Sequence, residues 1–144
     1  MAISLGRTIQ KLTIAPGKPQ FGGARLGHCE IQKGRRKSSH DPLEDDCLIL
    51  LAGMVAESLV TGQYCESGAA SDLRDVANLI CTRAASPRQH ETLQRRILAK
   101  TEHLLADDAH VEAIRIIAHE LLEKTTISGR SVRHHFNQAQ QRHS

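Results

Sequence analysis

Histidine and glutamate are the first residues in this sequence whose types and spacing could do chemistry. The dipeptide His-Glu occurs twice, at residues 90–91 and 119–120. In a helical His-Glu-x-x-His motif two histidines on one face bind zinc, and the glutamate accepts a proton from zinc-bound water. Neither occurrence completes that motif, because Gln94 and Glu123 stand where the second histidine would be. His119 and Glu123 share one helical face and could supply only two ligands.

The remaining histidines and the cysteines lack the spacing of a metal site. His28 and Cys29 are neighbours on an expected strand, so their side chains point to opposite faces. The cysteines are far apart and form no Cys-x-x-Cys pair; they are Cys29, Cys47, Cys65 and Cys81. This pattern is typical of reduced thiols rather than a disulfide framework, and we expect a cytoplasmic protein.

Composition excludes several classes of protein. The chain of 144 residues carries a formal net charge of +3 and only 2% aromatic residues, so no nucleic-acid partner is expected. The basic run Gly34–Lys37 is expected to be a solvated loop. The apolar stretch from Cys47 to Ala56 is shorter than the roughly 20 residues of a membrane span. A Gly-x-x-x-x-Gly-Lys-Ser/Thr phosphate-binding loop is absent from the sequence.

The N-terminal quarter of the chain is expected to form a β-hairpin. Ile9–Ile14 carries β-branched residues and is followed by a turn over Pro16–Gly23. Arg25–Gln32 is the expected returning strand, and Lys33–His40 is an expected basic loop. Residues 8–40 would then hold the hairpin and the loop.

About five helices are expected after residue 40. The first helix should begin at Asp41-Pro42 and end at Gly62. A second helix is expected over Ser71–Ala84. The third should begin at Ser86-Pro87, where Gln89 completes a capping box. The fourth helix should begin at Asp107-Asp108 and the fifth at Ser128. The predicted fold class is therefore mainly α, with a short N-terminal β-hairpin and a helical bundle over residues 41–141, in a single domain spanning residues 1–144.

One segment in the middle of the chain resembles a known family. Leu51–Leu59 reads Leu-Ala-Gly-Met-Val-Ala-Glu-Ser-Leu; Gly62 follows, and Ser67–Leu73 reads Ser-Gly-Ala-Ala-Ser-Asp-Leu. This pattern resembles the peptidase domain of the FtsH family of ATP-dependent zinc metalloproteases, and above all its short stand-alone relatives. Weaker likenesses are found at Lys11–Pro16, Gly23–Gly27 and Leu121–Gly129. The resemblance covers residues 8–136 in order and implies an FtsH peptidase-like fold.

The resemblance also implies a zinc site. In that family two histidines of a His-Glu-x-x-His helix and one downstream aspartate hold the ion, and the aspartate falls on Asp72. The loop that would shape the site contains Ser67, Gly68, Ala69 and Ser71. The two histidines and the glutamate have no counterpart here, so we expect no catalytic residue and no zinc bound by this chain alone. Asp72 also suits a purely structural place in the first turn of a helix, as does Asp75.

Two explanations of the missing motif remain open. The chain could be a truncated or mis-started zinc metalloendopeptidase whose preceding helix carries the histidines. Alternatively, it could be a catalytically inactive relative that serves as a binding or assembly module. In that case the face with Ala52, Gly53 and Ala56 would meet a second copy or another protein. The basic residues of the third and fourth helices, Arg95, Arg96, Lys100 and Arg115, are a further candidate contact. A nucleic-acid-binding helical domain that uses Arg35, Arg36 and Lys37 is a third, outside alternative.

Overall fold

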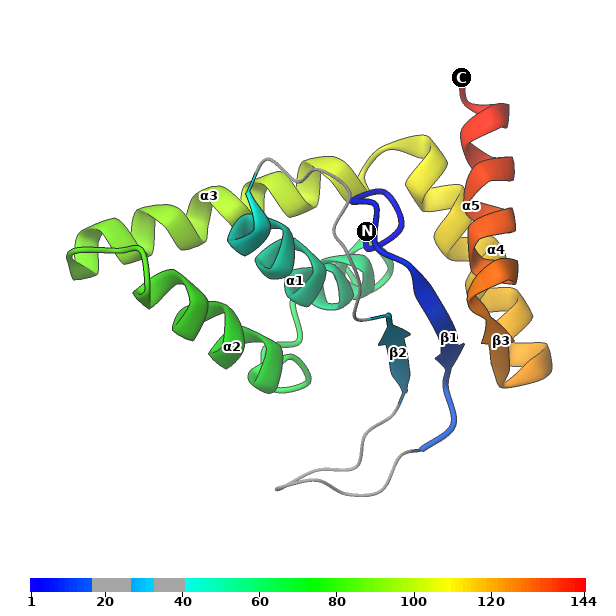
Figure 1. Cartoon of the computed structure of the whole chain (residues 1–144), viewed down its shortest axis with the longest axis horizontal. Helices are drawn as coiled ribbons and strands as arrows, with labels where there is room; N and C mark the ends of the chain where they lie inside the picture. Colours follow the sequence, from blue (N-terminus) through cyan, green and yellow to red (C-terminus); the bar gives the residue numbers. More distant parts are fainter. Residues whose placement is uncertain (17–26, 33–40) are drawn as a thin grey trace. The chain divides into compact units, whose positions relative to one another are not determined.

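The computed structural model describes residues 1–16, 27–32 and 41–144, and this part of the chain is mainly helical (Figure 1). Its strands are β1 (Ile9–Thr13), β2 (His28–Ile31) and β3 (Thr126–Ser128). Its helices are α1 (Pro42–Thr61), α2 (Ala70–Cys81), α3 (Pro87–Leu105), α4 (Asp108–Lys124) and α5 (Gly129–Arg142). The basic run with Arg35, Arg36 and Lys37 lies outside the described residues, as do the expected Lys33–His40 loop and most of the expected turn.

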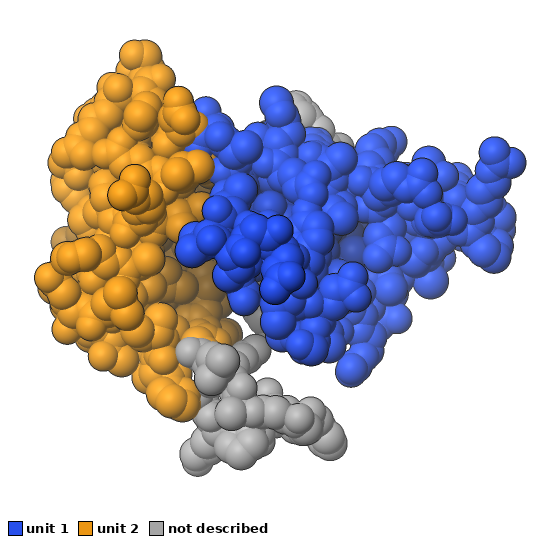
Figure 2. Space-filling view, turned by 180° about the vertical axis from the view of Figure 1, so that it is seen from behind, with its two compact units in different colours: residues 1, 38–107 blue, residues 2–37, 108–144 orange. Residues whose placement is uncertain are grey.

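The chain forms two compact units (Figure 2). The first unit contains residue 1 with residues 38–107, and therefore α1, α2 and α3. The second contains residues 2–37 and 108–144, and therefore the three strands with α4 and α5. The hairpin strands thus belong to the same unit as the C-terminal helices, although about a hundred residues separate them in the sequence.

Helix α1 begins and ends where its sequence predicts. Asp41 is the N-cap residue, and its Oδ1 accepts hydrogen bonds from the backbone nitrogens of Leu43 and Glu44, both at 3.2 Å. Pro42 occupies the first turn, where a missing N–H has no cost. Gly62 ends the helix in the left-handed conformation, with φ of 79°. These signals set the length of the helix that leads toward the Asp72 loop.

Apolar side chains from all three helices of the first unit form its core. The most completely buried members are Cys47, Leu48, Leu51, Val55, Val76, Ile80 and Leu105. Between α2 and α3, a ring nitrogen of His90 lies 3.2 Å from the Ala77 carbonyl oxygen. His90, one of the two His-Glu histidines, therefore takes part in helix packing.

The capping box expected at the start of α3 is present with one difference. Ser86 accepts a hydrogen bond from the backbone nitrogen of Gln89 at 3.2 Å, as predicted. The Gln89 side chain reaches back one residue further than the standard box and accepts from the backbone nitrogen of Ala85 at 2.7 Å. Helix α2 ends at Cys81, earlier than expected, and Thr82 is its C-cap.

The sheet of the second unit has the order β2-β1-β3 with antiparallel pairing throughout. The hairpin of β1 and β2 was predicted. In the structure Leu12 lies opposite Cys29. β3 was not predicted. It pairs Leu12 with Ile127 on the other edge of β1, and the hydroxyls of Thr13 and Thr126 lie 2.7 Å apart. Before β3, Thr125 adopts a positive φ of 64° to end α4.

Two apolar clusters hold α4 and α5 together. One contains Ala113, Phe136 and Ala139; the other contains Leu121, Ile127 and Val132, as expected for a hydrophobic staple at the start of α5. Ser128 caps α5 and accepts from the backbone nitrogen of Ser131 at 3.2 Å. Among the described residues, the helices are all too short or too polar to cross a lipid bilayer.

Candidate functional site

Asp72, the aspartate that the resemblance singles out, lies in the first turn of α2. The residue before this helix, Ala69, has no side chain that could cap it, and no side-chain cap bond forms there. A carboxylate in the first turn offsets the partial positive charge of the uncapped N-terminus. Asp72 is half-buried, whereas Asp75 is exposed. The position of Asp72 therefore agrees with the structural interpretation without requiring a metal.

The loop before α2 is a compact turn built around Cys65. The backbone nitrogen of Ala69 donates to the Cys65 carbonyl oxygen at 3.1 Å, and the Ser67 hydroxyl lies 3.5 Å from the Cys65 sulfur. A Cβ added at Gly68 would lie 3.2 Å from that sulfur, so a small residue is favoured there. Ala69 is buried and Ser71 is exposed. Of the four residues expected to shape a site, Ser67, Gly68 and Ala69 lie in this turn, whereas Ser71 already belongs to the first turn of α2, next to Asp72.

Tyr64 fixes the start of this loop against α3. Its hydroxyl donates to Oε1 of Glu102. Partial burial and the neighbouring Glu102 carboxylate raise the pKa of Tyr64 to about 12, so the phenol stays protonated at neutral pH. The tyrosine is therefore a hydrogen-bond donor here and a poor general base.

The donor residues in the described part of the chain do not fit a zinc ion. Within residues 1–16, 27–32 and 41–144, no group of three His, Cys, Asp or Glu side chains is close enough to hold a metal. The two-ligand pair that the sequence offered is His119 and Glu123, with Nδ1 3.7 Å from Oε1 and both side chains mostly exposed. A catalytic zinc needs three protein ligands and an open position, which this pair does not supply.

A polar cluster around Glu120 joins α4 to α5, and the sequence did not single out this cluster. Oε2 of Glu120 accepts from the Ser131 hydroxyl at 2.8 Å and lies 2.6 Å from Nε2 of His135. Oε1 of Glu120 accepts from the Lys124 ammonium at 2.6 Å. These hydrogen bonds from Lys124, Ser131 and His135 lower the pKa of Glu120 to about 2.

The types of residue around Glu120 are those of a hydrolase triad, but the geometry is not. In a triad the serine and the carboxylate bind different nitrogens of the histidine, so that the ring can take the serine proton. Here Ser131 and Glu120 both lie on the Nε2 side, and Nδ1 of His135 is buried without a partner. The Ser131 proton is held by a very weakly basic carboxylate. The cluster therefore ties two helices together and has no activated nucleophile.

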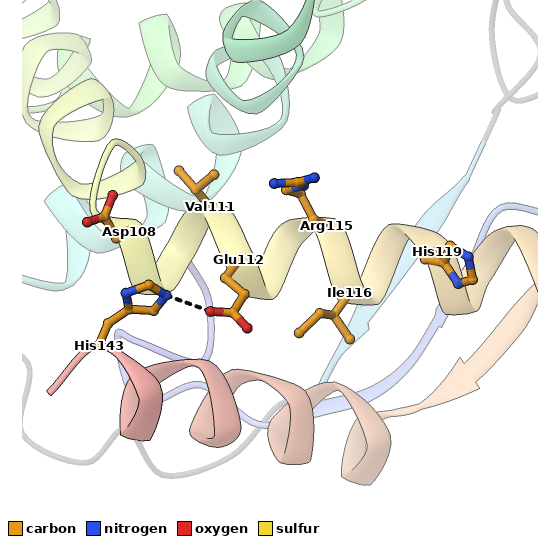
Figure 3. A pocket seen from close by; sticks show the side chains of 7 residues that line it. All are labelled: Asp108, Val111, Glu112, Arg115, Ile116, His119 and His143. Atoms are coloured by element: carbon orange, nitrogen blue, oxygen red, sulfur yellow. Dashed lines mark hydrogen bonds and ion pairs between the residues drawn. The ribbon is translucent and has the colours of Figure 1, made fainter.

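A shallow groove of about 680 Å³ lies along α4 near the end of α5 (Figure 3). Its lining residues are Asp108, Val111, Glu112, Arg115, Ile116, His119 and His143. Glu112 is the most constrained of them, because Nε2 of His143 lies 2.5 Å from its Oε2 and Arg142 donates to its Oε1 at 2.5 Å. These contacts, that of Arg142 first, lower the pKa of Glu112. Both oxygens of the Glu112 carboxylate are therefore already in contact with side chains of the same chain.

Sequence periodicity could not locate the Glu120 and Glu112 clusters. Apart from Lys124, which lies four residues after Glu120 on the same helix, their partners lie on α5 or directly after it, 11 to 31 residues away, where no i to i+4 spacing reveals them. Asp72 belongs to the first unit, whereas His119 and Glu123 belong to the second. No protein-family model and no curated protein matches this chain.

Proposed function

We propose that this chain is an FtsH-type peptidase-like domain, related to the ATP-dependent zinc metalloendopeptidases, that lacks the helix with the two histidines and the glutamate. One observation carries the proposal: the succession of elements from α1 to α2. Helix α1 ends at Gly62, a turn over residues 65–69 follows, and Asp72 lies in the first turn of α2. The Ser-Gly-Ala-Ala-Ser-Asp sequence of residues 67–72 thus coincides with a turn and helix start that place one carboxylate in the first turn of α2. The short strand pair before α1, and the segment that runs from α4 through β3 to α5, also support the proposal.

The zinc chemistry of that family is not assigned to this chain. Asp72 is the single ligand position that the resemblance carries over, and the described residues contain no group of three His, Cys, Asp or Glu side chains that could hold a metal ion. The chain would contribute only the fold and the Asp72 carboxylate to such a zinc site. No hydrolytic step is derived from its own residues.

The test of this proposal is to supply the missing helix. We would fuse an amphipathic helix with His-Glu-x-x-His ahead of residue 1 and measure zinc by elemental analysis. The expected result is one zinc per fused chain, lost in Asp72→Ala and retained in Asp75→Ala, which removes a carboxylate one turn further along the same helix. A fusion that binds no zinc, or binds it equally without Asp72, would contradict the peptidase-like assignment.

A second candidate function, a catalytically inactive binding or assembly module, is favoured by the surface of α1. Gly53 is exposed, and a Cβ built on it would have no atom within 4 Å. Ala52 and Ala56 flank it and are half-buried. Toward the end of the same helix Leu59 and Val60 are exposed, Val60 by 87%. We call the surface of Ala52, Gly53, Ala56 and Val60 the α1 face; its small and apolar residues would let a second helix approach closely.

The basic residues that offered another protein contact are largely engaged within the chain. Arg96 and Lys100 both donate to the Glu44 carboxylate, and Arg95 pairs with Glu91 at 2.7 Å. Their charges are therefore partly neutralised by neighbours. Between the two surfaces, the α1 face is the better candidate for a partner. We also propose the cytoplasm as its location, which the four free thiols support.

A further inference from the structure

Helix α4 has an outward side that its contacts with α5 and β3 do not use. Four residues share this side because they recur at helical spacing: Val111, Arg115, Ala118 and Leu122. The residues that pack α4 into the second unit, such as Ala113 and Ile117, lie on the other side of the helix. We call the surface of the four residues the α4 face.

The α4 face carries a large apolar side chain that is exposed to solvent. Leu122 is 78% exposed, and among the large apolar residues that the structure describes only Val60 on α1, at 87%, is exposed further. Ala118 is exposed and Val111 is half-buried. Val111 and Arg115 also line the groove described above, and Figure 3 shows both projecting from α4 away from α5. An apolar surface of this kind favours contact with a protein.

The α4 face and the α1 face carry charges of opposite sign. Arg115 lies in the middle of the α4 face, and Glu57 lies between Gly53 and Val60 on the side of α1 that carries the α1 face. Both side chains are exposed, and neither forms an ion pair within residues 1–16, 27–32 and 41–144. Each face therefore combines apolar surface with one charge that the other face could neutralise.

The two units as wholes show the same difference in charge. The first unit contains eleven Asp and Glu residues and six Lys and Arg residues, whereas the second contains five acidic and thirteen basic residues. Two copies of the chain would therefore attract each other when the first unit of one approaches the second unit of the other, and like units would repel. Charge thus favours pairing of an α1 face with an α4 face over pairing of two α1 faces.

The chain connection assigns the two faces of such a contact to different copies. Helix α1 packs against α2 and α3 through its buried side, and Gly53 lies on the side opposite to it. Only two residues, Ala106 and Asp107, connect α3 to α4. The α1 face thus points away from the helix to which α4 is joined, whereas a second copy can approach it without that restriction.

We propose that the α4 face of one copy binds the α1 face of a second copy, with Arg115 of the first opposite Glu57 of the second. This inference rests on the assembly module, the second candidate function above, and names its partner. Leu122 would pack against a helix surface of small residues around Gly53, which leaves room for a large side chain. Each copy offers both faces, so the contact either forms twice in a closed dimer or joins further copies head to tail.

Charge reversal on each face would test the proposal in the full chain. The dissociation constant for self-association would be measured by sedimentation velocity in about 50 mM NaCl, where surface charges are weakly screened. Arg115→Glu and Glu57→Arg should each raise this constant about fivefold or more, because like charges then face each other. The double variant should return close to the parent value, since the two charges are again opposite. The controls, Arg88→Glu and Glu66→Arg, reverse exposed charges elsewhere in the first unit and should change the constant less than about twofold.

The outcomes separate this inference from the assembly module on which it rests. If Gly53→Arg abolishes association and Arg115→Glu leaves it unchanged, the α1 face has another partner surface: the pairing with the α4 face is rejected and the assembly module stands. A double variant that associates as weakly as the single variants, or equal weakening by the controls, also rejects the pairing. A parent chain that is monomeric at every concentration rejects both. Circular dichroism of each variant shows that a loss of association is not a loss of fold.

Discussion

Gly129 lies where the first turn of α5 meets β1, and its lack of a side chain is a strict requirement. A Cβ at this position would lie 1.6 Å from the Ile9 carbonyl oxygen and 2.5 Å from its carbon. Both atoms belong to the backbone of a strand that pairs on both sides, so they cannot move aside cheaply. We expect Gly129→Ala to destabilise the protein by at least about 2–3 kcal/mol in urea unfolding.

Gly53→Ala is the matched control, because it adds the same methyl group to a glycine in a helix. Nothing lies within 4 Å of its Cβ position, and alanine has the higher helix propensity. This variant should be as stable as the parent or more stable, by up to about 1 kcal/mol. If Gly129→Ala proved as stable as Gly53→Ala, the close packing of α5 on β1 would be wrong.

Single residues with local roles were predictable from the sequence, and residues with distant partners were not. Asp41, Ser86 and Ser128 each bind backbone nitrogens two or three residues ahead, so the sequence alone contains both partners. Glu120 depends on Ser131 and His135, which approach it only after the chain has turned back. The same limit applies to Asp72: its helical position could be predicted, but only the structure shows that no three potential metal ligands come together among the described residues.

At the scale of elements, Glu120 joins α4 to α5 and makes the stability of that pair pH-dependent. Its pKa falls from 4.5 in a free side chain to about 2, chiefly through Lys124 and then through Ser131 and His135. A carboxyl with a lowered pKa stabilises the fold above its unfolded pKa, and this contribution is lost as pH falls from about 4.5 toward 2. Glu120→Gln should therefore unfold at lower urea than the parent at pH 7, and the difference should shrink below pH 4.

The control for this prediction is Glu123→Gln on the same helix. Glu123 is mostly exposed and lies 3.7 Å from a ring nitrogen of His119, so its removal should change urea unfolding little at any pH. A stability difference for Glu120→Gln that stayed constant from pH 7 to pH 3 would show that the carboxylate charge does not hold the two helices together.

The helices could be predicted because each one combines an apolar stripe with start or stop signals. β3 was missed because it has only three residues, too few for their polar-apolar-polar alternation to indicate a strand. It becomes a strand through pairing with β1, and its middle residue Ile127 is buried beside Leu121 and Val132. Such a strand depends on tertiary contacts, which local propensity does not contain.

At the scale of the whole molecule, we expect the 144-residue chain to be neither a zinc protein nor a peptidase by itself. The purified protein should contain well under one zinc per chain by elemental analysis, because Asp72 without further ligands does not retain the ion. It should cleave neither casein nor short peptides above background, with or without ATP. Stoichiometric zinc that disappears in Asp72→Ala, or turnover blocked by phenanthroline, would contradict this expectation.

The α1 face predicts association of the isolated chain. Because this face exposes Gly53 and Val60, we expect a dimer or larger species in sedimentation velocity at tens of micromolar protein. Gly53→Arg should shift the distribution toward monomer without loss of helix content, since the arginine side chain would enter open space. Arg88→Gln, an exposed change on α3, serves as the control and should leave the distribution unaltered. A parent protein that sediments as a monomer at every concentration would exclude this use of the face.

The central place of β1 has a consequence for how the chain acquires its structure. Its two neighbours are β2, which follows it closely, and β3, whose Thr126 hydroxyl meets that of Thr13 across 113 positions of sequence. Residues 38–107 contact mainly one another, so they can fold before the rest of the chain has been synthesised. One edge of Ile9–Thr13 stays unpaired until Thr126–Ser128 has been made, and long-range pairing of this kind is slow. The earliest strand to be synthesised is thus among the last to be completed, and during that interval its free edge is exposed to pairing with other chains.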